Sequence, residues 1–156
     1  MMNILDKIVA RKKEEVAFQM DNAPLESLFD GKYYHRNTIS LVENLNHPQS
    51  TGIIAEFKRK SPSKGIINDK LDSSSVTTAY QKAGAAAVSI LTDTDFFGGS
   101  VDDILNCREK LSIPILRKEF IVHPYQIHEA KAIGADLILL IAACLSPDQV
   151  RDFSQE

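Results

Sequence analysis

TGIIAEF, residues 51–57, is the first of four apolar runs of strand length in this chain. The other three are AAAVSIL (85–91), IPILRKEF (113–120) and ADLILLIAA (135–143). Their apolar residues are almost continuous rather than alternating. This pattern is typical of parallel strands that are covered by helices on one side and by a packed interior on the other. We therefore expect the four runs to form one parallel sheet.

Helical patterns separate the runs. They cover SSVTTAYQKAGA (74–85), SVDDILNCREKL (100–111), HPYQIHEAKAIGA (123–135) and, after the last run, SPDQVRDFSQE (146–156). Gly84 and Gly134 precede the second and fourth runs, where a helix needs a left-handed residue to end. Repeated βα units of about 25 to 35 residues are typical of an open doubly wound sheet or of a (β/α)8 barrel. Periodicity alone does not choose between these two α/β folds.

The residues before the first run form a helical lead-in with no strand pattern. Asn3 is a candidate N-cap for an amphipathic helix over about residues 3–19. Its apolar positions recur at helical spacing: Leu5, Ile8, Val9 and Val16. We expect its charged residues on the opposite face: Lys7, Arg11, Lys12, Glu14 and Glu15. Short helical pieces after Pro24 and around residues 38–45 complete the lead-in.

Composition limits the class of protein. The chain has 156 residues, of which 44% are hydrophobic and 25% charged, as in an ordinary soluble domain. Its formal net charge of −3 gives no electrostatic reason to expect nucleic acid or an anionic membrane as partner. The first residues lack the continuous apolar core of a signal peptide, and no run is long enough to span a membrane. We expect a cytoplasmic protein that binds a small molecule.

Neither the cysteines nor the histidines indicate a metal site. Cys107 and Cys144 lie outside any CxxC or Cys/His spacing, so we expect free thiols. The four histidines show no ligand spacing, and surface or capping roles are expected for them: His35, His47, His123 and His128. A GxSxG elbow and an HExxH pair are absent from the sequence, which argues against the commonest hydrolases.

Charged residues interrupt the first run at its end, where active sites of both candidate folds lie. A period of two places Glu56 and Lys58 on one face of this strand and Phe57 on the other. Burying an isolated charge costs several kcal/mol or shifts its pKa toward neutrality, so these charges must pair or carry function. A structural ion pair between Glu56 and a lysine is the alternative interpretation.

The third run ends in the same way. Its alternation places Lys118 and Phe120 on one face, and Arg117 and Glu119 on the other. Since the carboxyl ends of parallel strands share one edge of the sheet, this second lysine is expected at the same end of the fold as Glu56.

Two loops follow strands at this end. Residues 58–65, KRKSPSKG, contain four cations and suit an anionic substrate, although a solvated basic loop is the alternative. The loop is neither a Walker A motif nor a dinucleotide fingerprint, so no nucleotide cofactor is indicated. Residues 92–100, TDTDFFGGS, place Phe96 and Phe97 beside two glycines, for ring binding or for core packing.

Three long stretches together resemble the indole-3-glycerol phosphate synthase family, over essentially the whole chain: GIIAEFKRKSPSKG (52–65), SILTDTDFFGGS (89–100) and PILRKEFIVHPYQIHEAKAIGADLILLI (114–141). The resemblance implies a (β/α)8 TIM barrel. Residues 1–48 would be the helical N-terminal extension that covers the barrel mouth, and residues 49–156 the first half of the barrel, with about four βα units.

The resemblance also implies a reaction. Enzymes of this family act in tryptophan biosynthesis on 1-(2-carboxyphenylamino)-1-deoxyribulose 5-phosphate, and they close the indole ring with loss of carbon dioxide and water. The expected enzyme is a carbon-carbon lyase (carboxy-lyase) that needs no metal or organic cofactor. Its partner is a phosphorylated small molecule.

Site residues carry over by motif. Lys118 corresponds to the general acid that protonates the substrate carbonyl. Lys58 corresponds to a lysine that holds an anionic substrate group, and Glu56 to a carboxylate that positions lysine and substrate and assists proton transfer. Ser61 corresponds to a loop residue near the substrate. The expected walls of the pocket for the anthranilate ring are Phe97, Phe120 and Leu139.

A whole barrel needs about 250 residues, so the resemblance implies that this chain alone is inactive and self-associates through exposed strand edges. Two alternatives stay open. The chain could be a phosphosugar-binding module or inert half-barrel without catalysis, or another phosphosugar barrel such as phosphoribosylanthranilate isomerase. The isomerase would not explain EFKRKSPSKG (56–65).

Overall fold

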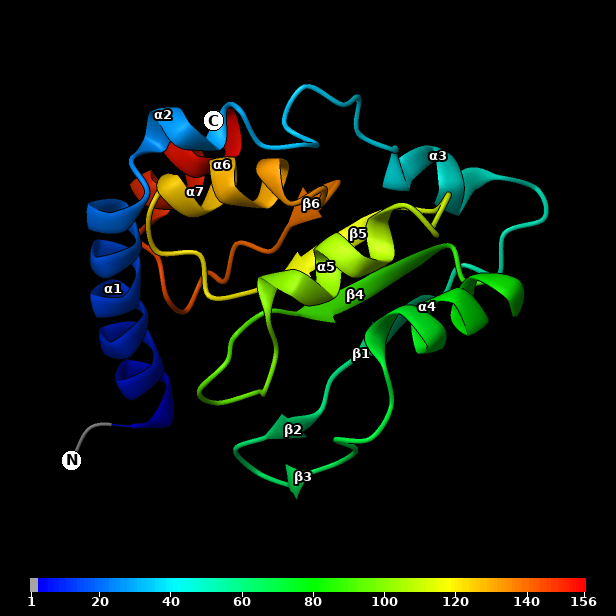
Figure 1. The fold of residues 1–156 in the computed structure, drawn as a ribbon, viewed down its shortest axis with the longest axis horizontal. Coiled ribbons are helices and arrows are strands. Elements are labelled where there is room, and N and C mark those ends of the chain that lie inside the picture. The colour runs from blue at the N-terminus through cyan, green and yellow to red at the C-terminus, as the bar shows by residue number, and fades with distance from the viewer. Residues whose placement is uncertain (1–2) are drawn as a thin grey trace.

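A computed structural model describes residues 3–156, so the first two residues of the expected segment 1–48 lie outside it. Its centre is a four-stranded parallel sheet (Figure 1). The strands are β1 (Ile54–Phe57), β4 (Ala87–Leu91), β5 (Ile115–Lys118) and β6 (Leu137–Ile138). The four expected strands and their parallel pairing are therefore confirmed.

The strand order chooses between the two α/β folds. The sheet runs β1-β4-β5-β6, so each strand lies beside the strand of the same sheet that follows it in the chain. A doubly wound sheet reverses its order at a switch point, whereas a (β/α)8 barrel adds strands in sequence. The described sheet is an arc of such a barrel.

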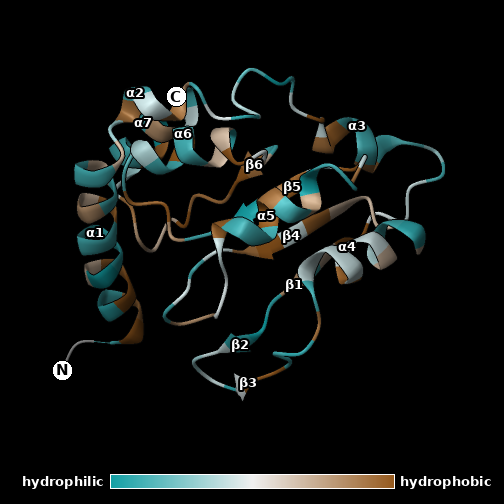
Figure 2. Ribbon diagram, in the orientation of Figure 1, coloured by the Kyte–Doolittle hydropathy of each residue, from teal (hydrophilic) through white to brown (hydrophobic). Residues whose placement is uncertain are grey.

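Helices cover this arc and form one layer of its core. They are α4 (Ser73–Lys82), α5 (Val101–Arg108), α6 (Tyr125–Ala132) and α7 (Pro147–Gln155). The first three pack against β1 and β4, against β5 and against β6, respectively. Hydrophobic residues are concentrated along β4, β5 and the segment after β6 (Figure 2). The main core joins strand and helix residues that are almost without exposure: Val88, Ile90, Ile104, Cys107 and Ile115.

Two helices end as the glycine pattern predicts. Gly84 and Gly134 have φ values of +92° and +95°, directly after α4 and α6. In each case the next residue, Ala85 or Ala135, donates its N–H back to the carbonyl of Tyr80 or Ala130. This is the Schellman motif, which satisfies carbonyls at a helix end and turns the chain into the following strand.

The lead-in contains α1 (Ile4–Asn22), α2 (Leu25–Leu28) and α3 (Leu41–Asn46). Asn3 and Asp6 form a capping box at the start of α1. In Figure 1, α1 stands across the end toward which the arrows of β4 and β5 point, which is the carboxyl end of the sheet. The prediction that Lys12 lies on the charged face of this helix is wrong. Lys12 lies between Ile8 and Val16 on the buried stripe, where carboxylates meet its ammonium group.

The fourth strand is shorter than expected. Residues 135–143 were expected as strand, but only Leu137–Ile138 are, paired with Leu116 and Arg117 of β5. β6 has a partner on one side only, so fewer hydrogen bonds extend it.

The basic loop after β1 contains an unexpected hairpin, β2 (Lys60–Ser61) with β3 (Gly65–Ile66).

Asp136 ties the lead-in to the amino end of the sheet. Its buried carboxylate accepts hydrogen bonds from Arg36, from Arg108 and from the backbone N–H groups of Ile39 and Ile115, at 2.6 to 2.8 Å. This carboxylate connects residues of the lead-in, α5 and β5.

Within residues 3–156, no helix is both long and apolar enough to cross a membrane.

Candidate active site

One carboxylate and two lysines meet at the carboxyl end of the sheet. Lys58 Nζ lies 2.7 Å from Glu56 Oε1, and Lys118 Nζ lies 2.9 Å from Glu56 Oε2. Both lysine side chains are 35% exposed and that of Glu56 is 28% exposed. The three charges therefore meet at one place, which fits both a shared site and the alternative interpretation, a structural ion pair between Glu56 and a lysine.

The sheet register explains how residues 62 positions apart in the chain can meet. Glu56 lies opposite Ser89 of β4, and Lys118 lies opposite Leu91, so β4 separates the two charges. Two strand spacings amount to about 10 Å, which two long side chains can bridge. Ser89 leaves room for this bridge, since its side chain is small and its hydroxyl donates to Glu56 Oε2 at 3.4 Å.

The two ammonium groups set the charge of the site. Partial burial by itself raises the pKa of Glu56, but the hydrogen bonds and charges of Lys58 and Lys118 outweigh it, so the pKa is lowered. Glu56 is therefore ionised at neutral pH, and it neutralises one of the two positive charges. The positive charge left on these three residues favours an anionic group next to the two ammonium groups.

A small cavity of about 90 Å³ opens beside these charges. Phe97 and Phe120 form part of its wall, with ring centroids 6.0 Å apart. An engineered cavity of about 150 Å³ holds one benzene molecule, so this space is smaller than a cavity that encloses a whole ring. The lining residues are Glu56, Lys58, Leu91, Asp93, Phe97, Lys118, Glu119, Phe120 and Ile141.

Two of the seven candidate residues do not line this cavity. Ser61 lies in β2, where its hydroxyl accepts from the backbone N–H of Lys64 at 3.2 Å. Leu139 is also absent from the lining, and Ile141 contributes instead. The alternation of a regular strand does not apply there, because β6 ends at Ile138.

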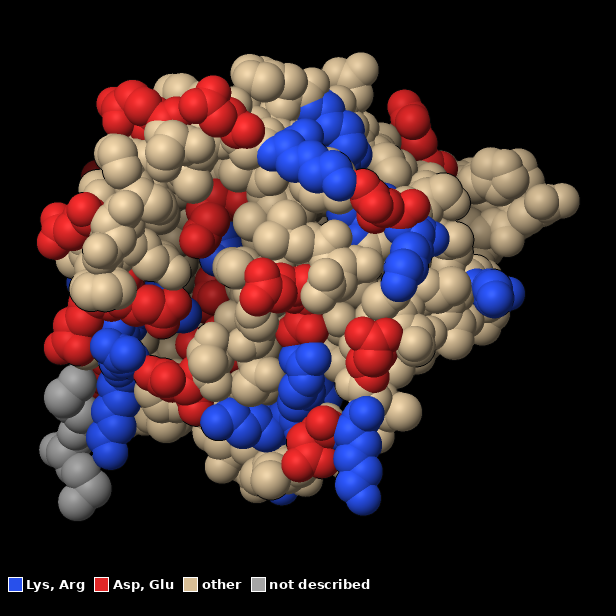
Figure 3. All heavy atoms as spheres, in the orientation of Figure 1, with Lys and Arg blue, Asp and Glu red and all other residues tan. Residues whose placement is uncertain are grey.

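Most cations of the basic loop are occupied by protein acceptors. Arg59 makes two bonds to Asp103, at 2.5 and 2.8 Å, and Lys60 donates to the carbonyl of Asp95 at 2.8 Å. Figure 3 shows Lys and Arg side chains over the β2–β3 hairpin with carboxylates among them. Of the other two cations of this loop, which was expected to suit an anionic substrate, Lys58 is bonded to Glu56 and Lys64 is exposed.

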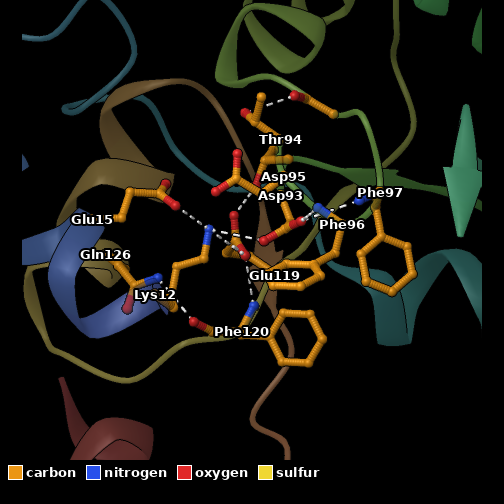
Figure 4. A network of polar contacts seen from close by, with 12 residues as sticks. Lys12, Glu15, Asp93, Thr94, Asp95, Phe96, Phe97, Glu119, Phe120 and Gln126 are labelled. Atoms are coloured by element: carbon orange, nitrogen blue, oxygen red, sulfur yellow. Dashed lines mark hydrogen bonds and ion pairs between the residues drawn. The ribbon is translucent and has the colours of Figure 1, made fainter. Parts of the chain in front are cut away.

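The sequence analysis missed a buried charge cluster beside the rings (Figure 4). Lys12 of α1 lies 3.2 Å from both Asp93 and Glu119, two residues that line the cavity. Glu119 was expected on the face away from Lys118, but β5 ends at Lys118 and the alternation stops there. A usable signal was present, because Lys12 is four residues from both Ile8 and Val16 of the apolar stripe.

The cysteines and histidines take structural roles. Cys107 is buried and Cys144 partly buried, and burial raises the pKa of both thiols. His47 and His123 each accept a backbone N–H two residues ahead. His128 is bonded to both Tyr34 and Glu156. Among residues 3–156, no group of three or more His, Cys, Asp or Glu side chains is arranged to hold a metal ion.

A barrel arc with a carboxylate and two lysines at its carboxyl end defines the class of (β/α)8-barrel proteins with a polar site at the barrel mouth. Comparison with known proteins specifies the family. The profile of the family "Indole-3-glycerol phosphate synthase" matches residues 5–156. The chain belongs to the indole-3-glycerol phosphate synthase family.

Individual relatives carry the same name. The chain is 42% identical to the indole-3-glycerol phosphate synthase of Bacteroides thetaiotaomicron over 156 residues, which are 100% of the chain and 60% of the relative. It is 43% identical to that of Bordetella pertussis and 44% identical to that of Burkholderia ambifaria, each over 97% of the chain and 59% of the relative. The chain thus spans about 60% of the length of the curated relatives that it matches.

Proposed function

We propose that this chain forms part of an indole-3-glycerol phosphate synthase, a carboxy-lyase of tryptophan biosynthesis. One observation carries the proposal: a carboxylate held between two lysines stands beside a cavity with two phenylalanine rings. The proposed substrate, 1-(2-carboxyphenylamino)-1-deoxyribulose 5-phosphate, combines an aromatic ring, a carboxylate and a phosphate. The two phenylalanine rings suit the aromatic ring, and the ammonium groups of Lys58 and Lys118 suit an anionic group.

Lys118 is the proposed general acid. When the aromatic carbon attacks the substrate carbonyl, negative charge develops on the carbonyl oxygen, and an ammonium group can give that oxygen a proton. The ring carboxylate then leaves as carbon dioxide, and its bonding electrons restore the aromatic ring. The new hydroxyl takes up a proton and leaves as water, while the neighbouring methylene carbon loses a proton to form the double bond. Lys118 suits the first step because its side chain is 35% exposed at the cavity and its ammonium group is held by Glu56.

Lys58 and Glu56 have supporting roles in this proposal. Lys58 Nζ lies at the cavity on the side of Glu56 Oε1, and it can meet an anionic substrate group in the ground state and the transition state alike. Glu56 binds both ammonium groups and so fixes their separation. It also assists proton transfer by holding the Lys118 ammonium group in place through a hydrogen bond of 2.9 Å.

Phe97 and Phe120 are the proposed walls for the anthranilate ring, since both line the cavity. Leu139 is proposed as a further wall for this ring and Ser61 as a loop residue near the substrate, although neither lines the described cavity. The lead-in of residues 1–48 is proposed to cover the barrel mouth, and α1 already stands at that end of the sheet (Figure 1).

A second function is favoured by the extent of the match. It is binding of a phosphosugar or ring ligand without catalysis, for which the cavity supplies two lysines and two phenylalanine rings in a chain that spans about 60% of its relatives. An inert module would bind the substrate without converting it, whereas a synthase would turn it over. Phosphoribosylanthranilate isomerase is disfavoured, since the family match rests on indole-3-glycerol phosphate synthase.

The test is a fluorescence assay of indole-3-glycerol phosphate formation. It is run on the 156-residue chain and on the longest open reading frame product that contains it, beside a binding titration with the same substrate. Synthesis by the longer product supports the proposal, and binding without synthesis by both supports the module. Absence of both binding and synthesis contradicts both functions.

A further inference from the structure

Lys12 is a buried cation from the lead-in that reaches into the loops of the sheet. It is 1% exposed, and its ammonium nitrogen lies 2.9 Å from Glu15, 3.2 Å from Asp93 and 3.2 Å from Glu119. Glu15 belongs to α1 itself, whereas Asp93 follows β4 by two residues and Glu119 directly follows β5. Lys12 therefore connects α1 with two separate loops at the barrel mouth (Figure 4).

The charge balance of this cluster keeps Lys12 ionised. Burial by itself lowers the pKa of the lysine, but Glu119, Glu15 and Asp93 together outweigh burial, and the pKa is raised. The partners are buried as well, with side chains of Asp93 and Glu119 each 2% exposed. Without Lys12, two carboxylates would be left close together in a buried place, which is strongly unfavourable.

Each of the two loop carboxylates also holds the backbone of a phenylalanine. Asp93 Oδ1 accepts the N–H of Phe96 at 2.7 Å and that of Phe97 at 3.1 Å, while Asp93 Oδ2 contacts Lys12. Glu119 Oε1 accepts the N–H of Phe120 at 2.8 Å and also contacts Lys12. One ammonium group thus ties together the two carboxylates that fix Phe97 and Phe120.

Glu119 has a second anchor that does not depend on α1. Its Oε2 accepts a hydrogen bond from the Thr92 hydroxyl at 2.8 Å. The same hydroxyl accepts a hydrogen bond from Arg117 Nε at 3.2 Å. Because Thr92 begins the loop after β4, its bond to Glu119 already joins the two loops, and Lys12 adds a second link between Asp93 and Glu119 that also includes α1. Loss of Lys12 should alter the spacing of the two rings more than it alters the sheet.

We propose that Lys12 is a positioning residue, which sets the separation of Phe97 and Phe120 and couples the lead-in helix to the width of the ring pocket. The inference deepens the proposed function, and it rests on that function only for the identity of the ring ligand. The geometry itself involves α1 and the two loops, whatever the ligand is.

The test uses 19F NMR of the chain with 4-fluorophenylalanine at its seven phenylalanines. The two pocket signals are assigned with Phe97→Leu and Phe120→Leu. Lys12→Met is expected to shift and broaden both signals. Glu119→Met should displace mainly the Phe120 signal, and Asp93→Ala mainly the Phe97 signal, because each carboxylate holds one of the two backbones.

Lys13→Met is the matched control, since Lys13 is the exposed neighbour of Lys12 on the same helix. It should leave both signals in place. A folded Lys12→Met protein with unmoved ring signals would overturn the proposal, even if its melting temperature fell. Should Lys12→Met not fold, the carboxylate variants still decide: unmoved Phe120 in Glu119→Met together with unmoved Phe97 in Asp93→Ala would overturn it. The spectrum does not depend on turnover, so failure of the synthase proposal stays distinguishable.

Discussion

At the scale of single residues, Glu56 is the group whose ionisation decides the charge of the site. Its pKa is lowered by the two lysines despite the opposing effect of burial. A carboxyl group whose folded pKa lies below its unfolded value stabilises the fold above the unfolded pKa. That contribution is lost as the pH falls through the lower, folded value.

We therefore expect the Glu56 carboxyl carbon to titrate, in 13C NMR, below the usual glutamate value of about 4.3. Lys118→Met should move this titration to higher pH, because it removes one of the two stabilising charges. Lys13→Met, which changes a lysine away from the site, should leave it unchanged. A midpoint at or above the usual value in the unaltered protein would contradict the described ion pairs.

Lys58 is expected to affect substrate binding as well as rate. In the active enzyme, Lys58→Ala should raise KM and lower kcat, because the lysine meets substrate charge in the ground state and the transition state. Lys58→Arg should restore only part of the activity, since a guanidinium differs in shape and reach. Steady-state kinetics give both constants, and an unchanged KM in both variants would count against a substrate-holding role.

At the scale of elements, Gly134 shows how a helix end fixes the entry to β6. Its φ is +95°, and an added Cβ would lie 2.8 Å from Arg108 Cγ and 3.0 Å from a ring carbon of Tyr33. Gly134→Ala should thus combine backbone strain with a clash, and should destabilise the fold by about 1–3 kcal/mol.

Gly52→Ala is the matched control for this prediction. Gly52 also has a positive φ, +69°, but an added Cβ there would meet nothing within 4 Å. Urea unfolding of both variants separates the two effects, and the Gly134 variant should be the less stable one. Equal losses would show that packing against Arg108 and Tyr33 contributes nothing.

Some features of these elements could be predicted from the sequence, and others could not. The strands, the glycine-ended helices and the meeting of Glu56 with Lys118 follow from local patterns, because periodicity and strand ends are written in neighbouring residues. The cluster of Lys12 does not follow from them, since its partners come from two loops more than 80 residues away. The end of β6 at Ile138 depends on pairing, which the apolar run alone does not define.

At the scale of the whole molecule, the sheet of the 156-residue chain has two edges, β1 and β6. Ile53 and Ile54 at the first edge are 57% and 42% exposed, and the segment after β6 is apolar (Figure 2). Such edges offer unpaired backbone groups and hydrophobic side chains to a second copy.

We expect the purified 156-residue chain to self-associate without measurable indole-3-glycerol phosphate synthesis. Two arcs could pair edge to edge in a closed two-fold arrangement, which would satisfy backbone groups of both. Sedimentation at about ten to one hundred micromolar, the range of ordinary weak dimers, checks this expectation. A stable monomer would refute the association, and turnover by the purified chain would refute its inactivity.

Lys118 is the proposed general acid of an indole-3-glycerol phosphate synthase, so its replacement should slow the reaction more than that of any exposed lysine. The most direct measurement is the steady-state kinetics of Lys118→Ala in the active enzyme, with exposed Lys13→Ala as the control. The variant should lose about 100-fold to 10,000-fold in kcat, roughly 3 to 5 kcal/mol of transition-state stabilisation, with a much smaller change in KM. A Lys118→Ala enzyme that keeps more than about half of the parental rate, where general acid catalysis requires a loss of at least about 100-fold, would contradict the claim.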